Sequence, residues 1–154
     1  MAISQELRSY MDQCGVAFEE VPHAHTLQAA KAAEASHISG KRVAKAVLVR
    51  VGDGYMLAVL PSSKQVRFEE LGRVLGRDVS LADERESVTL FPGCALGALP
   101  PIGAAFGLQT VLDDELLAAD DVYFEGGDHR TLVHVDGADW RRLVRDAGHC
   151  AFSA

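Results

Sequence analysis

The fold class is decided by the stretch Val43-Ala-Lys-Ala-Val-Leu-Val-Arg-Val-Gly-Asp-Gly-Tyr-Met-Leu-Ala-Val-Leu60. Its two halves, 43–51 and 55–60, are rich in Val and Leu, and the Gly52-Asp53-Gly54 segment between them is typical of a β-hairpin turn. Three consecutive apolar residues, Val47 to Val49, indicate that both faces of the first strand are covered. The stretch therefore predicts a central strand pair.

Outward from this hairpin, helices and short strands mix without a regular βαβ alternation. Helices are expected over 4–14, 26–36, 68–75, 82–90 and 138–147, and short strands over 16–21, 79–81, 111–112, 122–124 and 132–135. Ser4 and Thr26 are the expected N-caps, and the acidic run 113–115 is expected to start a further helix. The pattern predicts one α+β domain over residues 1–154, with a mixed, largely antiparallel central sheet flanked by helices.

The composition is typical of a globular protein in a reducing compartment. The chain has 154 residues, of which 48% are hydrophobic and 24% charged, and this length fits one domain. No basic run followed by an apolar segment opens the chain, and no stretch approaches the roughly 20 apolar residues that cross a bilayer. Cys14, Cys94 and Cys150 form no C-x-x-C pair, which argues against a disulfide framework or a structural metal. We therefore expect a cytoplasmic protein with no membrane partner.

Charge is distributed unevenly along the chain, whose formal net charge is −7. Residues 1–77 contain ten Lys or Arg against eight Asp or Glu, whereas residues 78–154 contain five against fourteen. The basic residues of the first half could form a local basic face: Lys41, Arg42, Lys45, Arg50, Lys64 and Arg67. This balance disfavours tight binding of a long duplex, but it is compatible with binding the end of a nucleic acid.

Lys45 stands near the start of the central strand. Strand alternation places its side chain on one face with Val43 and Val47, which is an apolar neighbourhood for an ammonium group. One interpretation is a lysine that extends from the strand end to water. The other is a cation held at a pocket to bind a phosphate or a carbonyl oxygen.

The loop Gly97-Ala98-Leu99-Pro100-Pro101-Ile102-Gly103 has an unusual composition for a plain connector. Prolines fix φ and remove two N–H groups, while glycines permit close approach of the backbone to a ligand. The loop is either a rigid surface turn or a presenter of backbone N–H groups to an oxyanion or ester carbonyl. It is not a P-loop, because the G-K-[ST] element is absent.

Two further segments are candidates for the walls of a pocket. Gly126-Gly127-Asp128-His129 is explained by a hairpin turn or, alternatively, by a turn that lines the same pocket. His23 and His25 face the same way on an extended strand and could line a polar pocket, but no third metal ligand is convincingly placed. We expect no metal and no cofactor, and no Ser-His-Asp order is evident.

Taken in order, four segments resemble the YbaK/EbsC family, which also occurs as the editing insertion of bacterial prolyl-tRNA synthetases. They are His25-Thr26 before an Ala-rich helix, Val43-Ala-Lys45, the Gly97–Gly103 loop and Val122-Tyr-Phe-Glu-Gly-Gly127. The resemblance covers nearly the whole chain. It implies a single α+β domain that hydrolyses the ester of a mischarged tRNA, usually a wrong amino acid on tRNA for proline.

The resemblance also implies roles for individual residues. Lys45 matches the functionally important lysine of the family and would contact the 3′-terminal adenosine region or its phosphate. The Gly97–Gly103 loop would shape the amino-acid pocket and offer donors to the carbonyl. The attacking group would be a water or a group of the substrate, with no metal and no covalent nucleophile. The expected partner is the 3′ acceptor end of an aminoacyl-tRNA, with a synthetase as a further candidate.

Three positions depart from the branch of the family that acts on cysteinyl-tRNA. That branch typically has a small polar residue at Pro100, a tyrosine near His23 and a serine at Glu125. The expected substrate is therefore not the cysteinyl one. Two alternatives to a deacylase stay open: a non-catalytic module that binds an aminoacyl-adenosine-like ligand or a synthetase, and a hydrolase of small esters or amides unrelated to tRNA.

Overall fold

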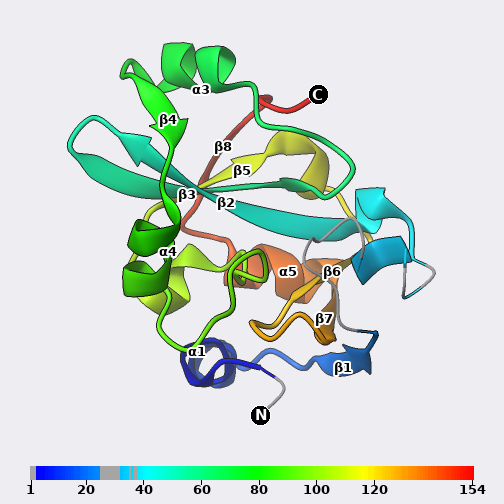
Figure 1. Ribbon diagram of the computed structural model, residues 1–154. Helices are drawn as coiled ribbons and strands as arrows, with labels where there is room; N and C mark the ends of the chain where they lie inside the picture. Colours follow the sequence, from blue (N-terminus) through cyan, green and yellow to red (C-terminus); the bar gives the residue numbers. More distant parts are fainter. Residues whose placement is uncertain (1–2, 25–31, 35, 37) are drawn as a thin grey trace.

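The computed structural model describes residues 3–24, 32–34, 36 and 38–154, and its elements follow the sequence pattern closely (Figure 1). The helices are α1 (Gln5–Cys14), α3 (Phe68–Leu75), α4 (Glu84–Leu90) and α5 (Gly137–Leu143), with 3-10 turns η1 (Gly40–Arg42), η2 (Gly103–Phe106) and η3 (Asp114–Leu116). The strands are β1 (Glu19–Pro22), β2 (Val43–Val51), β3 (Gly54–Pro61), β4 (Val79–Leu81), β5 (Thr110–Asp113), β6 (Asp121–Glu125), β7 (Thr131–Asp136) and β8 (Gly148–Cys150). The helix expected from Thr26 begins outside the described residues.

All of these strands join one mixed sheet in the order β1-β7-β6-β2-β3-β5-β8, with β4 paired to β2. The pairs β1–β7, β6–β7, β2–β3 and β2–β4 are antiparallel, and β2–β6, β3–β5 and β5–β8 are parallel. The predicted hairpin closes at the pair Val51 and Gly54, where Gly52 has the left-handed φ of 58° that a tight hairpin turn requires. The α+β prediction with a mixed sheet is confirmed.

Both faces of β2 are covered, as its apolar run predicted. Leu48 packs into a core that includes Leu7 of α1, Trp140 of α5 and Phe91, the residue after α4. Val49 faces the opposite way, into a second core that contains Leu71 of α3. Figure 1 shows the same division, with α1 and α5 on one side of the β2–β3 hairpin and α3 on the other.

The helix ends carry the caps that the sequence predicts. Ser4 accepts a hydrogen bond from the backbone N–H of Leu7, and Gly15 ends α1 with a φ of 66°. Gly76 ends α3 in the same left-handed conformation. Before α4, Asp83 and Glu86 form a reciprocal capping box.

The structure differs from the sequence expectations near the C-terminus. The acidic run forms only the 3-10 turn η3, α5 ends at Leu143, and the unexpected strand β8 follows it. The segment after β8 is held by Asp113, whose buried carboxylate accepts hydrogen bonds from the backbone N–H groups of Phe152 and Ser153 and from the Ser153 hydroxyl. The carboxylate fixes the C-terminal segment through Oδ2, while its Oδ1 accepts a hydrogen bond from the backbone N–H of Glu115 and caps the short turn η3.

None of the helices in the described ranges has the length and apolar character needed to cross a bilayer.

Candidate functional site

The candidate site lies on one face of the sheet, where two rows of side chains cross strands β1, β7, β6 and β2. The first row is Glu19, His134, Tyr123 and Val43, as the strand registers define it. The second row, two residues further along, contains Val21, Leu132 and Glu125. One step beyond the last β2–β6 pair, Lys45 continues this second row next to Glu125. The side-chain alternation of both strands puts Lys45 and Glu125 on the same face.

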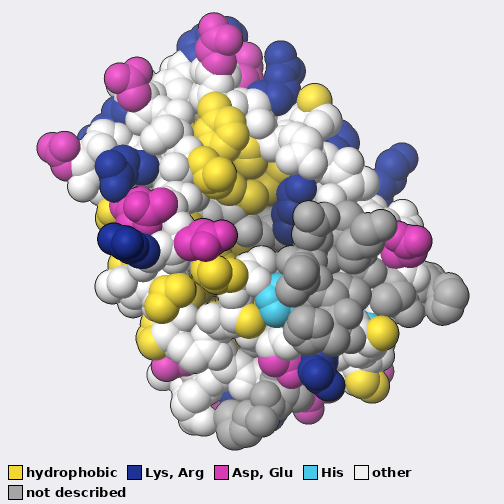
Figure 2. Space-filling view, viewed as in Figure 1, with side chains coloured by type: hydrophobic (Ala, Val, Ile, Leu, Met, Phe, Trp, Pro, Cys, Tyr) yellow, Lys and Arg dark blue, Asp and Glu magenta, His cyan; other side chains and the backbone are white. Residues whose placement is uncertain are grey.

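Lys45 is half-buried at the boundary between two apolar clusters. Val43, two residues before it, belongs to a cluster with Leu132, and Val47, two residues after it, packs against the core beneath α3. Burial lowers the pKa of Lys45, and no charged side chain contributes to that shift. Within the described part of the chain, its ammonium makes no ion pair. Figure 2 shows hydrophobic side chains gathered over β2 and β3 beside β4.

Glu125 is a buried carboxyl held by a histidine. The side chains of Glu125 and His23 are 4% and 0% exposed, and Nε2 of His23 lies 3.1 Å from Oε1 of Glu125. Burial raises the pKa of Glu125 to about 8, with a further contribution from Asp128, while the backbone N–H of His129 opposes the shift. The other ring nitrogen of His23, Nδ1, lies 2.6 Å from the carbonyl oxygen of Ala24. Because a carbonyl only accepts, Nδ1 carries a proton.

The turn after Glu125 is longer than a two-residue hairpin. Asp128 Oδ1 accepts hydrogen bonds of 2.9 Å from the backbone N–H groups of Arg130 and Thr131, which closes the loop locally. His129 is buried and has a φ of 63°, a conformation that no other non-glycine residue of the described chain adopts. Such backbone strain in a buried histidine is typical of functional turns. The predicted pocket wall at Gly126, Gly127 and His129 thus lies directly after Glu125.

The glycine-proline loop reaches the same turn at its beginning. The backbone N–H of Ala95 donates to the carbonyl oxygen of Gly127 over 2.8 Å. From Ala98 to Gly103 the loop is buried, and Leu99 and Ile102 pack into the core on the α1 and α5 side of the sheet. The loop is therefore ordered by packing and is not an exposed surface turn. No hydrogen bond among the described residues joins it to Lys45.

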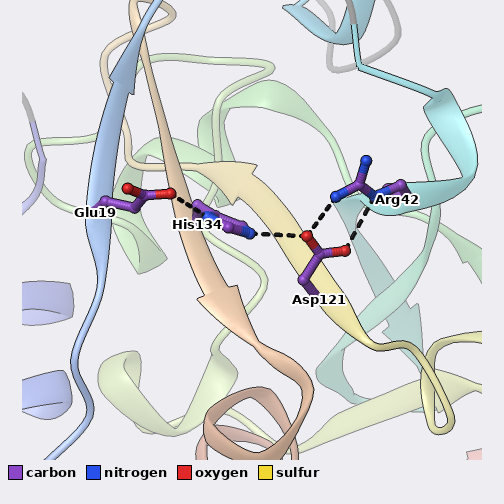
Figure 3. A network of polar contacts seen from close by, with 4 residues as sticks. All are labelled: Glu19, Arg42, Asp121 and His134. Carbon is purple, nitrogen blue, oxygen red and sulfur yellow. Dashed lines mark hydrogen bonds and ion pairs between the residues drawn. The ribbon is translucent and has the colours of Figure 1, made fainter.

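A polar network lies beside the Lys45 row on the same face (Figure 3). His134 contacts Glu19 through Nδ1 and Asp121 through Nε2, the latter at 2.9 Å, and Asp121 in turn accepts two hydrogen bonds from Arg42. Tyr123 stacks on the His134 ring with centroids 4.1 Å apart, and the Arg42 guanidinium lies over Tyr123. Arg42, expected in a free basic face, is instead paired with Asp121.

Two other members of the predicted basic face are also paired, Arg50 with Glu86 and Lys64 with Glu115. His25 lies outside the described residues, so its predicted place in the pocket stays a prediction. Among the residues that are described, no group of three His, Cys, Asp or Glu side chains is arranged to hold a metal ion.

Glu125 did not enter the predicted site, although it occupies the row of Lys45. Its partnership with His23 joins residues 102 positions apart, and it depends on the registers of β1, β7 and β6. One signal in the sequence was available. Glu125 stands directly after the apolar run Val122–Phe124 and directly before two glycines. This position at the end of an apolar strand indicates a buried carboxyl, which needs a partner.

Residues 22–143 match the aminoacyl-tRNA editing domain family. The chain belongs to this family. The match includes every described element from the end of β1 to α5, and hence both candidate loops and Lys45. No curated protein sequence matches the editing domain significantly.

Several solved structures share the fold of this editing domain. The hypothetical protein APE2540 superposes with a TM-score of 0.84 at 22% identity, over 97% of this chain and all of its own. A protein described as a candidate trans-editing enzyme for prolyl-tRNA synthetase gives 0.81 at 23% identity, over 97% of this chain and 96% of its own. A candidate signal transduction protein from Marinobacter aquaeolei VT8 gives 0.81 at 19% identity, over 99% of this chain but only 31% of its own.

Proposed function

We propose that this editing domain is a trans-acting deacylase that hydrolyses the ester bond of a mischarged aminoacyl-tRNA. The observation that carries the proposal is the half-buried ammonium of Lys45, which has no ion-pair partner among the described residues of an editing-family chain. The proposed substrate is tRNA for proline carrying a small non-cognate amino acid. The sequence motifs support this choice, as does the description of one similar structure as a candidate trans-editing enzyme for prolyl-tRNA synthetase.

The proposed chemistry needs little more than positioning. An aminoacyl ester is already activated, so orientation and a few fixed dipoles suffice to accelerate its hydrolysis. Water adds to the ester carbonyl, the carbon–oxygen bond to the ribose breaks, and the departing ribose oxygen takes up the proton. The ammonium of Lys45 binds the terminal phosphate or the carbonyl oxygen and holds the ester in place.

The glycine-proline loop is proposed to contribute backbone donors near the end of β6, where the segment before it meets the Gly126–Gly127 turn through the hydrogen bond from Ala95 to Gly127. The N–H groups of Leu99 and Ile102 donate to no other described residue, although both residues are buried. Backbone N–H groups without an acceptor in the described protein can donate to a ligand carbonyl. Pro100 and Pro101 between them hold the loop in one conformation.

Selection against proline would rest mostly on the size of the amino-acid pocket. A hydrophobic pocket discriminates by about 1–3 kcal/mol for each methylene group. Proline is therefore excluded by a pocket that accepts alanine or a residue of similar size. We further propose that residues 1–154 act as one domain in the cytoplasm, on the 3′ acceptor end of the tRNA and with a synthetase as a candidate partner.

The direct test is a deacylation panel with the purified protein. The panel contains tRNA for proline charged with alanine, serine, cysteine or proline, and tRNA for alanine charged with alanine. We expect hydrolysis of at least one small-residue ester on tRNA for proline, and slower hydrolysis of the prolyl ester. The variant Arg73→Ala removes an exposed positive charge on α3 and is the control for charge alone, with unchanged rates expected.

The same panel distinguishes the alternatives. Saturable binding of an aminoacyl-adenosine analogue with no turnover on any tRNA would replace the deacylase by a binding module. Turnover that does not depend on the tRNA portion would indicate a hydrolase of small esters.

A further inference from the structure

Lys45 and Glu125 are an ammonium and a carboxyl that follow the last paired residues of β2 and β6, yet the described structure shows no ion pair between them. The parallel register of β2 and β6 ends at the pair Ala44 and Phe124, and Lys45 and Glu125 are the next residues of the two strands, on the same face. Neighbouring strands lie about 5 Å apart, so side chains of this length can meet across them. Nevertheless, no ion pair between them is formed within the described structure, and burial alone lowers the pKa of Lys45.

His23 explains the separation, because it engages the carboxyl from the other side. It follows β1, and its backbone N–H is fixed by a 2.7 Å hydrogen bond to the carbonyl oxygen of Arg130. Its ring is completely buried, and Nε2 contacts Oε1 of Glu125 at 3.1 Å. With Nδ1 committed to the carbonyl oxygen of Ala24, only Nε2 is available to Glu125.

A proton lies in the hydrogen bond between the side chains of His23 and Glu125. If His23 is neutral, its Nε2 accepts a hydrogen bond from a protonated Glu125. If His23 is cationic, Nε2 donates to the ionised carboxylate. In both cases the pair has no net charge, so it does not neutralise the ammonium of Lys45. The pKa of about 8 for Glu125 favours the neutral arrangement at neutral pH.

We propose that His23 is a positioning residue, which acts through Glu125 to keep the ammonium of Lys45 without a counter-ion and available to an anionic or carbonyl group of the substrate. The substrate part of this inference rests on the proposed function, whereas the effect on Lys45 does not. Other groups that face Glu125 do not replace His23. Leu132 on β7 is apolar, the Asp128 charge disfavours ionisation of Glu125, and His129 acts through its backbone N–H.

The first test is the pH titration of Lys45 itself, which is monitored by NMR of protein with isotope-labelled lysine. The chain has four lysines, and a Lys45→Arg sample assigns the signal. In His23→Ala the released carboxylate is expected to pair with Lys45, so the pKa of Lys45 rises above its value in the unaltered protein. In the double variant His23→Ala/Glu125→Gln no carboxylate remains, and the pKa of Lys45 returns. An unchanged Lys45 titration in His23→Ala overturns the proposal.

A conservative variant separates positioning from folding. The amide of Gln at position 23 can place its oxygen near the position of Nε2, where it accepts the hydrogen bond of a protonated Glu125, so His23→Gln is expected to keep both the Glu125 contact and the Lys45 titration. Thermal unfolding of each variant identifies those that are merely destabilised. If His23→Gln disturbs Lys45 as strongly as His23→Ala does, the contact to Glu125 is not the cause and the proposal fails.

The second test is the rate of deacylation. For His23→Ala we expect kcat/KM to fall about tenfold at pH 8, mainly through KM, as when an ion pair worth about 1.4 kcal/mol must be broken. Introducing Glu125→Gln into this variant removes the carboxylate that would pair with Lys45. The kcat/KM of the double variant should therefore return to within about threefold of that of Glu125→Gln alone. Loss without restoration contradicts the positioning role. If Lys45 titrates as expected but no aminoacyl-tRNA is hydrolysed, the proposed function fails and the positioning of Lys45 stands.

Discussion

Among single residues, Glu125 bears most directly on how the site responds to pH. Its side chain is 4% exposed, and burial raises its pKa to about 8, compared with an ordinary value of about 4.5. The folded protein therefore holds the Glu125 proton more tightly than the unfolded chain does. Between these two values, rising pH removes a proton from the unfolded state first, so this residue lowers stability as pH increases.

We predict that Glu125→Gln becomes progressively more stable relative to the unaltered protein as pH rises from 5 to 8.5. The amide cannot ionise, but it can still hydrogen-bond to His23. The expected gain over this interval is more than about 1.4 kcal/mol, the energy that corresponds to a pKa difference of one. Urea unfolding at several pH values measures it, and a stability difference that does not vary with pH would contradict the assignment.

Residue-level inference from the sequence was accurate where it depended on local periodicity. The face of Lys45 follows from strand alternation, and the structure places Val43 and Val47 on that face. The contact between His23 and Glu125 could not be found in this way, because it requires the registers of three strands. A one-residue slip in any of them would turn these side chains to opposite faces.

Among the elements, the loop around Gly103 is constrained by close packing. A Cβ atom at Gly103 would lie 2.1 Å from Oγ1 of Thr110 and 2.8 Å from the carbonyl oxygen of Leu108. The second contact is with backbone, which cannot move away without shifting the approach to β5. The glycine is therefore required by the close approach of the loop to this strand.

We predict that Gly103→Ala lowers the free energy of unfolding by about 1–3 kcal/mol, the usual cost of overpacking. Gly148→Ala is the matched control, because a Cβ there meets no atom within 4 Å and its backbone conformation is ordinary. This control is expected to change stability by less than about 0.5 kcal/mol. Urea denaturation compares the two, and equal stabilities would show that the loop does not pack as described.

The element boundaries show which signals in the sequence are local. The central hairpin and α3 were predicted within one residue, because Gly52 and Gly76 end their elements by left-handed backbone conformations. The acidic run at 113–115 starts only the short 3-10 turn η3 and no longer helix. Asp113 caps this turn through Oδ1 and also binds the C-terminal segment through Oδ2, and this long-range partner has no counterpart in local periodicity.

In the molecule as a whole, the network of Figure 3 ties β1, β7, β6 and η1 together beside the candidate site. Burial acts to lower the pKa of His134, but hydrogen bonds to Glu19 and Asp121 outweigh it and raise the pKa above its usual value. A raised histidine pKa contributes stability below its unfolded value of about 6.5, and the contribution is lost as pH rises through the folded pKa.

We predict that His134→Ala destabilises the protein more at pH 5.5 than at pH 8.5, by roughly 1 kcal/mol, the order of one charge-assisted hydrogen bond. The control His149→Ala removes an exposed histidine paired with Asp114, and its effect should stay within about 0.5 kcal/mol at both pH values. Thermal or urea unfolding provides the comparison. A larger effect of His134→Ala at high pH would reverse the sign and refute the network's role.

The central claim is that Lys45 serves deacylation, and its most direct test is kcat/KM for mischarged tRNA for proline, measured with the unaltered protein and with Lys45→Ala. The best substrate of the deacylation panel is used, with Arg73→Ala as the control for charge. Lys45→Ala is predicted to lower kcat/KM tenfold or more, at least roughly 1.4 kcal/mol of transition-state stabilisation. Full activity of folded Lys45→Ala would contradict the claim.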